Sequence, residues 1–128
     1  MILDASAILA VLLRESEHEE IFVKLGTEEA LNVGAPTLVE VGMILTSRLG
    51  DRGTEMLRRF LQEGEVTVLP FRETEFHEAV EAFRRFGKGR HPAALNFGDC
   101  MAYATARLAG QRLLCRGDDF PQTDLELA

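Results

Sequence analysis

The sequence is poor in cysteine and has no long uninterrupted apolar run. Only two cysteines, Cys100 and Cys115, occur among its 128 residues, and their spacing matches neither a metal-binding nor a redox motif. We therefore expect free thiols in a reducing compartment. The apolar stretch 1–13 is interrupted by Asp4; it has no basic leader and is too short to cross a bilayer. These absences predict a cytoplasmic protein with no membrane partner.

Positive charge is also scarce. The chain carries 14 Lys and Arg against 21 Asp and Glu, which gives a formal net charge of −7. Proteins that bind nucleic acid regardless of sequence gain affinity by neutralising phosphates with basic side chains. The charge therefore argues against a broadly basic nucleic-acid binder. It remains compatible with a nuclease, whose active site can itself be acidic.

Only six of the acids are aspartates. Aspartate disfavours helix interiors and concentrates at helix caps, turns and functional sites, so each one is informative. Glutamate favours helices, and we interpret most of the glutamates as solvated helix surface.

The length suits one domain, 1–128, that needs no disulfide or metal to stabilise its core. Short apolar runs alternate with helical patterns along the chain. Ser6 is expected to cap the first helix, Gly26 to end the second, and Asp51 to cap the fourth. The pattern predicts a single α/β domain with a central parallel sheet of about four to five strands and helices on both faces. The predicted strands are 1–4, 30–34, 66–71 and 112–115, and the predicted helices are 6–14, 17–25, 36–49, 51–63, 73–86 and 98–108.

Several acids fall at the ends of predicted elements. Asp4 ends the first strand, Asp99 opens the last helix, and Asp118 and Asp119 follow the last strand. Each has an ordinary explanation as a helix cap or a turn residue. Ligands of parallel sheets, however, bind beyond the carboxyl ends of the strands. These acids are therefore candidates for one shared site.

A further acid, Glu40, interrupts the predicted helix 36–49, which is apolar on more than one side. A buried carboxylate must be paired, bind a metal or become neutral. Several carboxylates brought together repel one another, and divalent cations relieve that repulsion. Ligands that are all oxygen favour Mg²⁺ or Mn²⁺ over Zn²⁺. A solvated surface glutamate is the alternative for Glu40.

These residues resemble the PIN-domain ribonucleases, and specifically the VapC-type toxins of bacterial toxin–antitoxin pairs. The resemblance spans nearly the whole chain, and four motifs carry it in order. They are Met-Ile-Leu-Asp-Ala-Ser at 1–6, Pro-Thr-Leu-Val-Glu at 36–40, Asn-Phe-Gly-Asp-Cys at 96–100, and Leu-Cys-Arg-Gly-Asp-Asp-Phe at 114–120 with Thr-Asp at 123–124.

The resemblance implies a Mg²⁺- or Mn²⁺-dependent endoribonuclease, a hydrolase in which the metal activates water and neutralises charge on the scissile phosphate. By the same resemblance Asp4, Glu40 and Asp99 are metal-binding, catalytic acids, and Ser6 is an auxiliary residue beside the first of them. Asp118 is expected to be the fourth acid because it comes first after the strand. Asp119 is the alternative for that role, and otherwise an auxiliary residue.

The family resemblance also implies partners. They are a cognate VapB-type antitoxin, an RNA substrate and a second copy of the chain in a homodimer. The candidate RNA-binding residues are basic side chains near the acids, which otherwise form a solvated helix end. They are Arg84, Arg85, Lys88, Arg90 and Arg116.

Three rival interpretations remain at this point. A receiver-type signalling domain also has an acidic Mg²⁺ pocket, but it requires an aspartate after the third strand and a lysine after a later one. Here Arg72 follows the strand 66–71, and the only lysines are Lys24 and Lys88. The second rival is a catalytically inactive binding module that keeps the PIN fold. The third is a nuclease that processes ribosomal RNA precursors, a class that usually carries extra domains.

Overall fold

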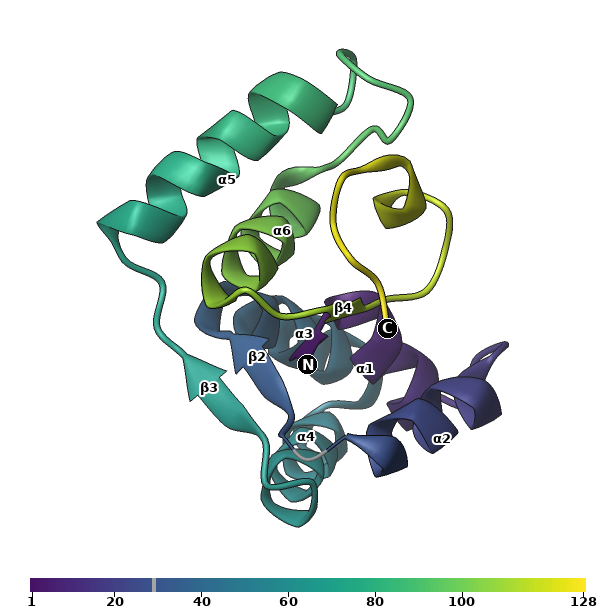
Figure 1. Cartoon of the computed structure of the whole chain (residues 1–128). Helices are drawn as coiled ribbons and strands as arrows, with labels where there is room; N and C mark the ends of the chain where they lie inside the picture. The colour runs from purple at the N-terminus through teal and green to yellow at the C-terminus, as the bar shows by residue number, and fades with distance from the viewer. Residues whose placement is uncertain (29) are drawn as a thin grey trace.

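A four-stranded parallel sheet forms the centre of the computed structural model, which describes residues 1–28 and 30–128. The order of the strands is β3-β2-β1-β4 (Figure 1). The predicted parallel sheet is confirmed, and its four strands lie inside the predicted ranges. The strands are β1 (Ile2–Leu3), β2 (Asn32–Gly34), β3 (Thr67–Leu69) and β4 (Leu113–Leu114).

Helices cover both faces of the sheet, as predicted. Figure 1 shows α5 running along α6 on one side of the molecule. No helix in the described residues is long and apolar enough to cross a membrane. The helices are α1 (Ala5–Leu12), α2 (His18–Thr27), α3 (Ala35–Leu49), α4 (Asp51–Glu63), α5 (Glu73–Phe86) and α6 (Phe97–Ala109), and a short 3₁₀ helix, η1, spans Phe120–Gln122.

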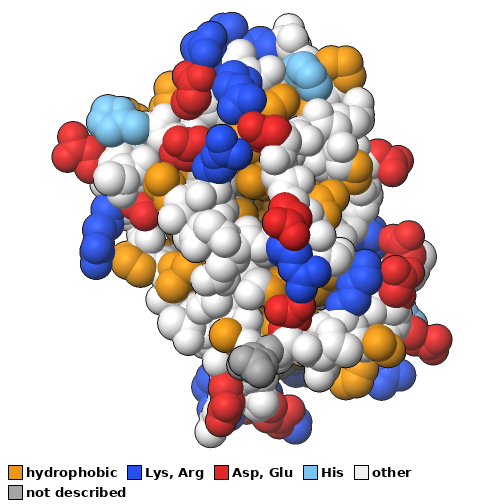
Figure 2. Space-filling model, in the orientation of Figure 1, with side chains coloured by type: hydrophobic (Ala, Val, Ile, Leu, Met, Phe, Trp, Pro, Cys, Tyr) orange, Lys and Arg blue, Asp and Glu red, His pale blue; other side chains and the backbone are white. Residues whose placement is uncertain are grey.

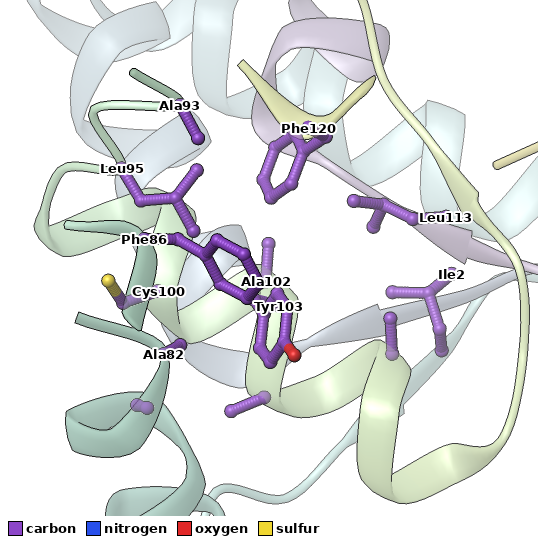
Figure 3. Close-up of a cluster of buried hydrophobic side chains, with 13 residues drawn as sticks. Ile2, Ala82, Phe86, Ala93, Leu95, Cys100, Ala102, Tyr103, Leu113 and Phe120 are labelled. Carbon is purple, nitrogen blue, oxygen red and sulfur yellow. The ribbon is translucent and has the colours of Figure 1, made fainter. Parts of the chain in front are cut away.

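The core has two halves, one on each face of the sheet, because successive side chains of a strand point to opposite faces. Ile2 of β1 packs with residues of α5 and α6, whereas the next residue, Leu3, packs with α1, α3 and α4. The half of the core that contains Ile2 also includes Tyr103 and Phe120, which are both buried (Figure 3). Phe120 therefore fixes the chain that follows β4 to the same core as α6.

Three predicted helix boundaries were wrong, each for a local reason. Asp4, not Ser6, is the N-cap of α1, because Asp4 has extended backbone angles and its carboxylate accepts a hydrogen bond from the Ser6 N–H. Asp51 does not cap α4. Gly50, at φ +60°, separates α3 from α4, so Asp51 already lies in the helix. Gly26 does not end α2, which continues to Thr27 because glycine is tolerated at this helical position.

Candidate metal centre

Asp4 lies at the carboxyl end of β1 and is only 5% exposed. Its Oδ2 accepts hydrogen bonds from the Ser6 backbone N–H (2.9 Å) and from the Ser6 hydroxyl (2.6 Å). The same hydroxyl accepts a bond from the backbone N–H of Arg116 (2.9 Å), just after β4. Burial raises the pKa of Asp4, the bonds from Ser6 oppose the rise, and the charge of Asp119 adds to it. This carboxylate is therefore held rigidly at a position where its charge is costly.

Asp99 is the third residue of α6 and forms a reciprocal capping pair with Asn96. The Asn96 side chain accepts from the Asp99 N–H, and Asp99 Oδ2 accepts from the Asn96 N–H, both at 2.9 Å. Burial raises the pKa of Asp99 to about 6; the bond from Asn96 opposes the rise, and the charges of Asp4 and Asp119 add to it. Sequence reasoning treated Asp99 as a possible cap and missed Asn96, although an asparagine three residues before an acid is a readable capping signal.

Glu40 extends from α3 toward the N-terminus of α6. A methyl group on Gly98 would collide with Oε2 of Glu40, so the glycine provides the space that the carboxylate occupies. Partial burial raises the pKa of Glu40, and the charges of Asp4 and Asp99 raise it further. Glu40, Asp4 and Asp99 therefore share one site. Gly98 is a second residue that sequence reasoning left without a role.

The two aspartates after β4 differ in their surroundings. Both are exposed, but only Asp119 is among the charges that raise the pKa of Asp4 and of Asp99. Of the two residues considered for the fourth acid, the electrostatics of Asp4 and Asp99 therefore favour Asp119 over the preferred Asp118. We refer to Asp4, Glu40, Asp99 and Asp119 as the acid cluster.

The acid cluster has the chemistry of a divalent-cation site. Its donors are carboxylate oxygens, which suit Mg²⁺ and Mn²⁺. Within residues 1–28 and 30–128, no cluster member forms an ion pair with a basic side chain. In the same residues, no three His, Cys, Asp or Glu side chains are arranged closely enough to hold a metal ion as they stand. The fit to a divalent cation therefore rests on the chemistry of the donors.

Comparison with known proteins identifies the family. The PIN domain family matches residues 1–126. Ribonuclease VapC36 of Mycobacterium tuberculosis is 43% identical over 127 residues, which cover 98% of this chain and 91% of that protein. The chain belongs to the VapC family of PIN-domain ribonucleases. The family predicted from the four sequence motifs is thereby confirmed.

Solved VapC structures have the same fold. The M. tuberculosis toxin VapC20, described as cleaving the sarcin–ricin loop, matches with a TM-score of 0.81 at 17% identity over 99% of this chain and 97% of its own. The DNA-bound VapBC of Salmonella typhimurium matches with a TM-score of 0.78 at 15% identity, over 99% and 95%. Membership of the VapC family removes the receiver-type alternative and leaves two rivals, an inactive PIN module and a nuclease that processes ribosomal RNA precursors.

Several basic residues predicted to bind RNA form ion pairs inside this VapC-type chain. Arg84 pairs with Glu81 within α5 (2.6 Å), and Arg116 pairs with Glu15 (2.7 Å). Arg85 pairs with an aspartate of the C-terminal segment. On the face shown in Figure 2, Lys and Arg side chains lie beside Asp and Glu. The remaining two candidates, Lys88 and Arg90, lie in the loop between α5 and α6.

Proposed function

We propose that this VapC-type ribonuclease is the toxin of a type II toxin–antitoxin pair and cuts RNA by Mg²⁺- or Mn²⁺-dependent endonucleolytic hydrolysis. The observation that carries the proposal is the acid cluster. Burial raises the pKa of Asp4, Glu40 and Asp99 at the carboxyl edge of the sheet, and neighbouring carboxylates add to each rise: Asp119 at Asp4, Asp4 and Asp119 at Asp99, and Asp4 and Asp99 at Glu40. A divalent cation is the ligand that offsets this concentration of negative charge.

Asp4, Glu40, Asp99 and Asp119 would hold the metal. A bound divalent cation lowers the pKa of a water molecule and neutralises charge that builds up on the scissile phosphate. Asp4 uses Oδ2 for both bonds from Ser6, which leaves Oδ1 as its freer oxygen. Asp99 is oriented in the same way, because its Oδ2 accepts from Asn96. The chain thus supplies oriented oxygens, and hydrolysis requires no Ser, Cys or His nucleophile.

The RNA backbone must be held next to this negative site. Lys88 and Arg90 lie in the loop that leads into α6, and we propose them as the first phosphate contacts. Arg84, Arg85 and Arg116 would have to exchange an intramolecular carboxylate for a phosphate before they contact RNA. Affinity should therefore come from the metal and from a few local cations, in keeping with a chain of net charge −7.

A cognate VapB-type antitoxin is the expected inhibitor, since the similar Salmonella typhimurium structure is a VapBC assembly. The acid cluster supports this proposal chemically. A basic side chain of the antitoxin placed among the four carboxylates would form charge-assisted hydrogen bonds and would compete with the metal.

A second copy of the chain is the proposed partner for an exposed apolar face. Phe97, at the start of α6, is 81% exposed and lies between two grooves of about 500 and 420 Å³. Val39 and Met43 of α3 line one groove, and Phe76 and Val80 of α5 line the other. A protruding ring flanked by apolar grooves suits the self-complementary contact of a twofold dimer.

A direct assay tests the enzymatic proposal. The chain, purified without antitoxin, is incubated with total RNA in Mg²⁺, in Mn²⁺ and in excess chelator. We expect endonucleolytic cleavage with either metal and none with chelator. An inactive PIN module would leave the RNA intact under all three conditions, and cleavage that continues in chelator would contradict the metal mechanism. Sequencing of the cut ends would then identify the target RNA.

A further inference from the structure

A polar network around the exposed Asp124 joins three distant parts of the chain, and only Tyr103 among its members is buried. The hydroxyl of the fully buried Tyr103 donates to Oδ1 of Asp124 at 2.6 Å. Oδ2 of Asp124 accepts from Arg85 at 3.0 Å and lies 3.5 Å from Arg107. The network therefore connects α5 and α6 to the C-terminal segment, which Figure 1 draws in yellow beside α6.

The bond from the buried Tyr103 makes Asp124 an anchor for the C-terminal segment. Burial alone would raise the pKa of Asp124, but the bonds from Tyr103 and Arg85 outweigh it, and the pKa is lowered. Asp124 thus remains charged at neutral pH, and the exposed guanidinium groups of Arg85 and Arg107 pair with it at the surface. The ring of Tyr103 packs against Phe86, with ring centres 5.8 Å apart, and Figure 3 shows the two rings together in the core. The hydroxyl of Tyr103 consequently has a fixed position.

The hydrogen bond between Tyr103 and Asp124 fixes the C-terminal end of the segment 117–124, which carries Asp119. The segment leaves β4 through Gly117, whose φ of +101° turns the chain, and reaches Asp124 after one turn of 3₁₀ helix. Asp119 is exposed and directly precedes the buried Phe120. Between the end of β4 and Asp124, Phe120 is thus the one buried side chain of the segment. Two fixed points, Phe120 and Asp124, determine where Asp119 lies.

We propose that Asp124 and Tyr103 are positioning residues that hold Asp119 beside Asp4 and Asp99. Asp124 takes no direct part in the cluster, since the charges that act on Asp4 and Asp99 include Asp119 and not Asp124. It acts through the segment 117–124. Loss of the anchor frees the segment around Phe120, and the cluster then binds a cation with three acids in place of four. This inference rests on the proposed function, because it concerns the same metal site.

The test measures the binding of Mn²⁺ alone to the full chain by calorimetry, with RNA cleavage followed in parallel. We expect Asp124→Ala to weaken Mn²⁺ binding about tenfold, the usual effect of removing a residue that orients a ligand. Tyr103→Phe removes a single hydroxyl, and the fold should tolerate the change. We expect it to weaken Mn²⁺ binding too, but by less than Asp124→Ala does. Both variants should need more Mn²⁺ than the wild type for half-maximal RNA cleavage. At saturating Mn²⁺, their kcat should equal that of the wild type.

A double variant separates positioning from general destabilisation. If Asp124 acts through Asp119, then Asp119→Asn with Asp124→Ala binds Mn²⁺ no more weakly than Asp119→Asn alone. Leu57→Ala is the matched control, because it weakens the core half on the opposite face of the sheet. It should lower the melting temperature and leave the Mn²⁺ affinity unchanged.

The inference is overturned if Asp124→Ala and Tyr103→Phe bind Mn²⁺ as tightly as the wild type does. It is also overturned if the double variant binds Mn²⁺ more weakly than Asp119→Asn by the full factor that Asp124→Ala causes alone. Failure of the ribonuclease proposal has a different signature. In that case the wild type binds Mn²⁺ but cuts no RNA, and the binding series still decides the role of Asp124. A wild type that binds no Mn²⁺ at millimolar concentration contradicts both.

Discussion

The hydroxyl of Ser6 donates a 2.6 Å hydrogen bond to Oδ2 of Asp4 and also accepts one from the backbone N–H of Arg116. One small side chain thus orients the first acid and ties it to the chain after β4. We predict that Ser6→Ala weakens Mn²⁺ binding and RNA cleavage by roughly ten- to a hundredfold. Mn²⁺ titrations of cleavage rate provide the measurement.

Ser6→Thr is the control for this prediction, because threonine keeps an oxygen at the same position. It should retain most of the activity that Ser6→Ala loses. If both variants match the wild type, the hydrogen bonds of Ser6 have no influence on the metal site.

Keeping Asp99 ionised destabilises the metal-free fold, so removing its charge should stabilise the protein. Asn at position 99 keeps an oxygen that accepts the Asn96 N–H but removes the charge. In the absence of metal, Asp99→Asn should therefore melt above the wild type at pH 7.5, by about 3 °C after allowance for the partial exposure of the carboxylate. Saturating Mn²⁺ should reverse the order, because only the wild type gains full stability from the ligand.

The pH dependence of this difference has a definite sign. The pKa of Asp99 is raised from its ordinary value of 3.8 to about 6 in the folded chain. Between these values the folded state binds more protons than the unfolded state, so this group destabilises the metal-free fold progressively as pH rises. The advantage of Asp99→Asn should accordingly disappear near pH 4. An advantage that stays constant from pH 4 to 7.5 would contradict a raised pKa.

Gly98 makes a purely steric prediction. Gly98→Ala places a methyl group on Oε2 of Glu40, so it should displace that carboxylate and weaken Mn²⁺ binding about tenfold. Gly26→Ala is the matched control within a helix, where nothing lies within 4 Å of the added methyl group. It should stabilise α2 by about 0.5–1 kcal/mol and leave cleavage unchanged. Equal activity of the two variants would refute the role assigned to Gly98.

The proposed dimer depends on Phe97. Phe97→Ser should weaken self-association at least about a hundredfold, since a central aromatic side chain commonly dominates an interface. Leu108→Ser is the control, because Leu108 is an exposed apolar residue on the same helix that lines neither groove. Sedimentation over a range of concentrations measures both. If Phe97→Ser dimerises as tightly as the wild type, the dimer interface does not include Phe97.

Local sequence signals account for most of the fold. The alternation of apolar runs and amphipathic segments was sufficient to place the four strands and six α-helices of the described residues, but not the 3₁₀ helix η1, and glycine or proline marked several of their ends. Two of the three errors came from competition between neighbouring candidate caps. Asp4 and Ser6 both suit an N-cap, and only the backbone angles show that Asp4 occupies it. Gly50 and Asp51 compete in the same way at the start of α4.

The candidate site was predictable only as a set of residue types at strand and helix ends. The sequence could not distinguish Asp118 from Asp119, because the geometry of the turn decides which of the two charges acts on Asp4. It also could not show that Arg85 is already paired with Asp124, 39 residues away. Contacts of this kind depend on how α5 and the C-terminal segment pack, and no local pattern encodes them.

In the proposed mechanism, one acid cluster both binds the cation and cuts RNA. The most direct measurement titrates Mn²⁺ into the chain and records heat and RNA cleavage in the same buffer, for the wild type and for Asp99→Asn. We predict that the two midpoints coincide in the wild type and that both shift to much higher Mn²⁺ in the variant. Cleavage that persists in excess chelator, or an Asp99→Asn variant with the wild-type midpoint, would contradict the account.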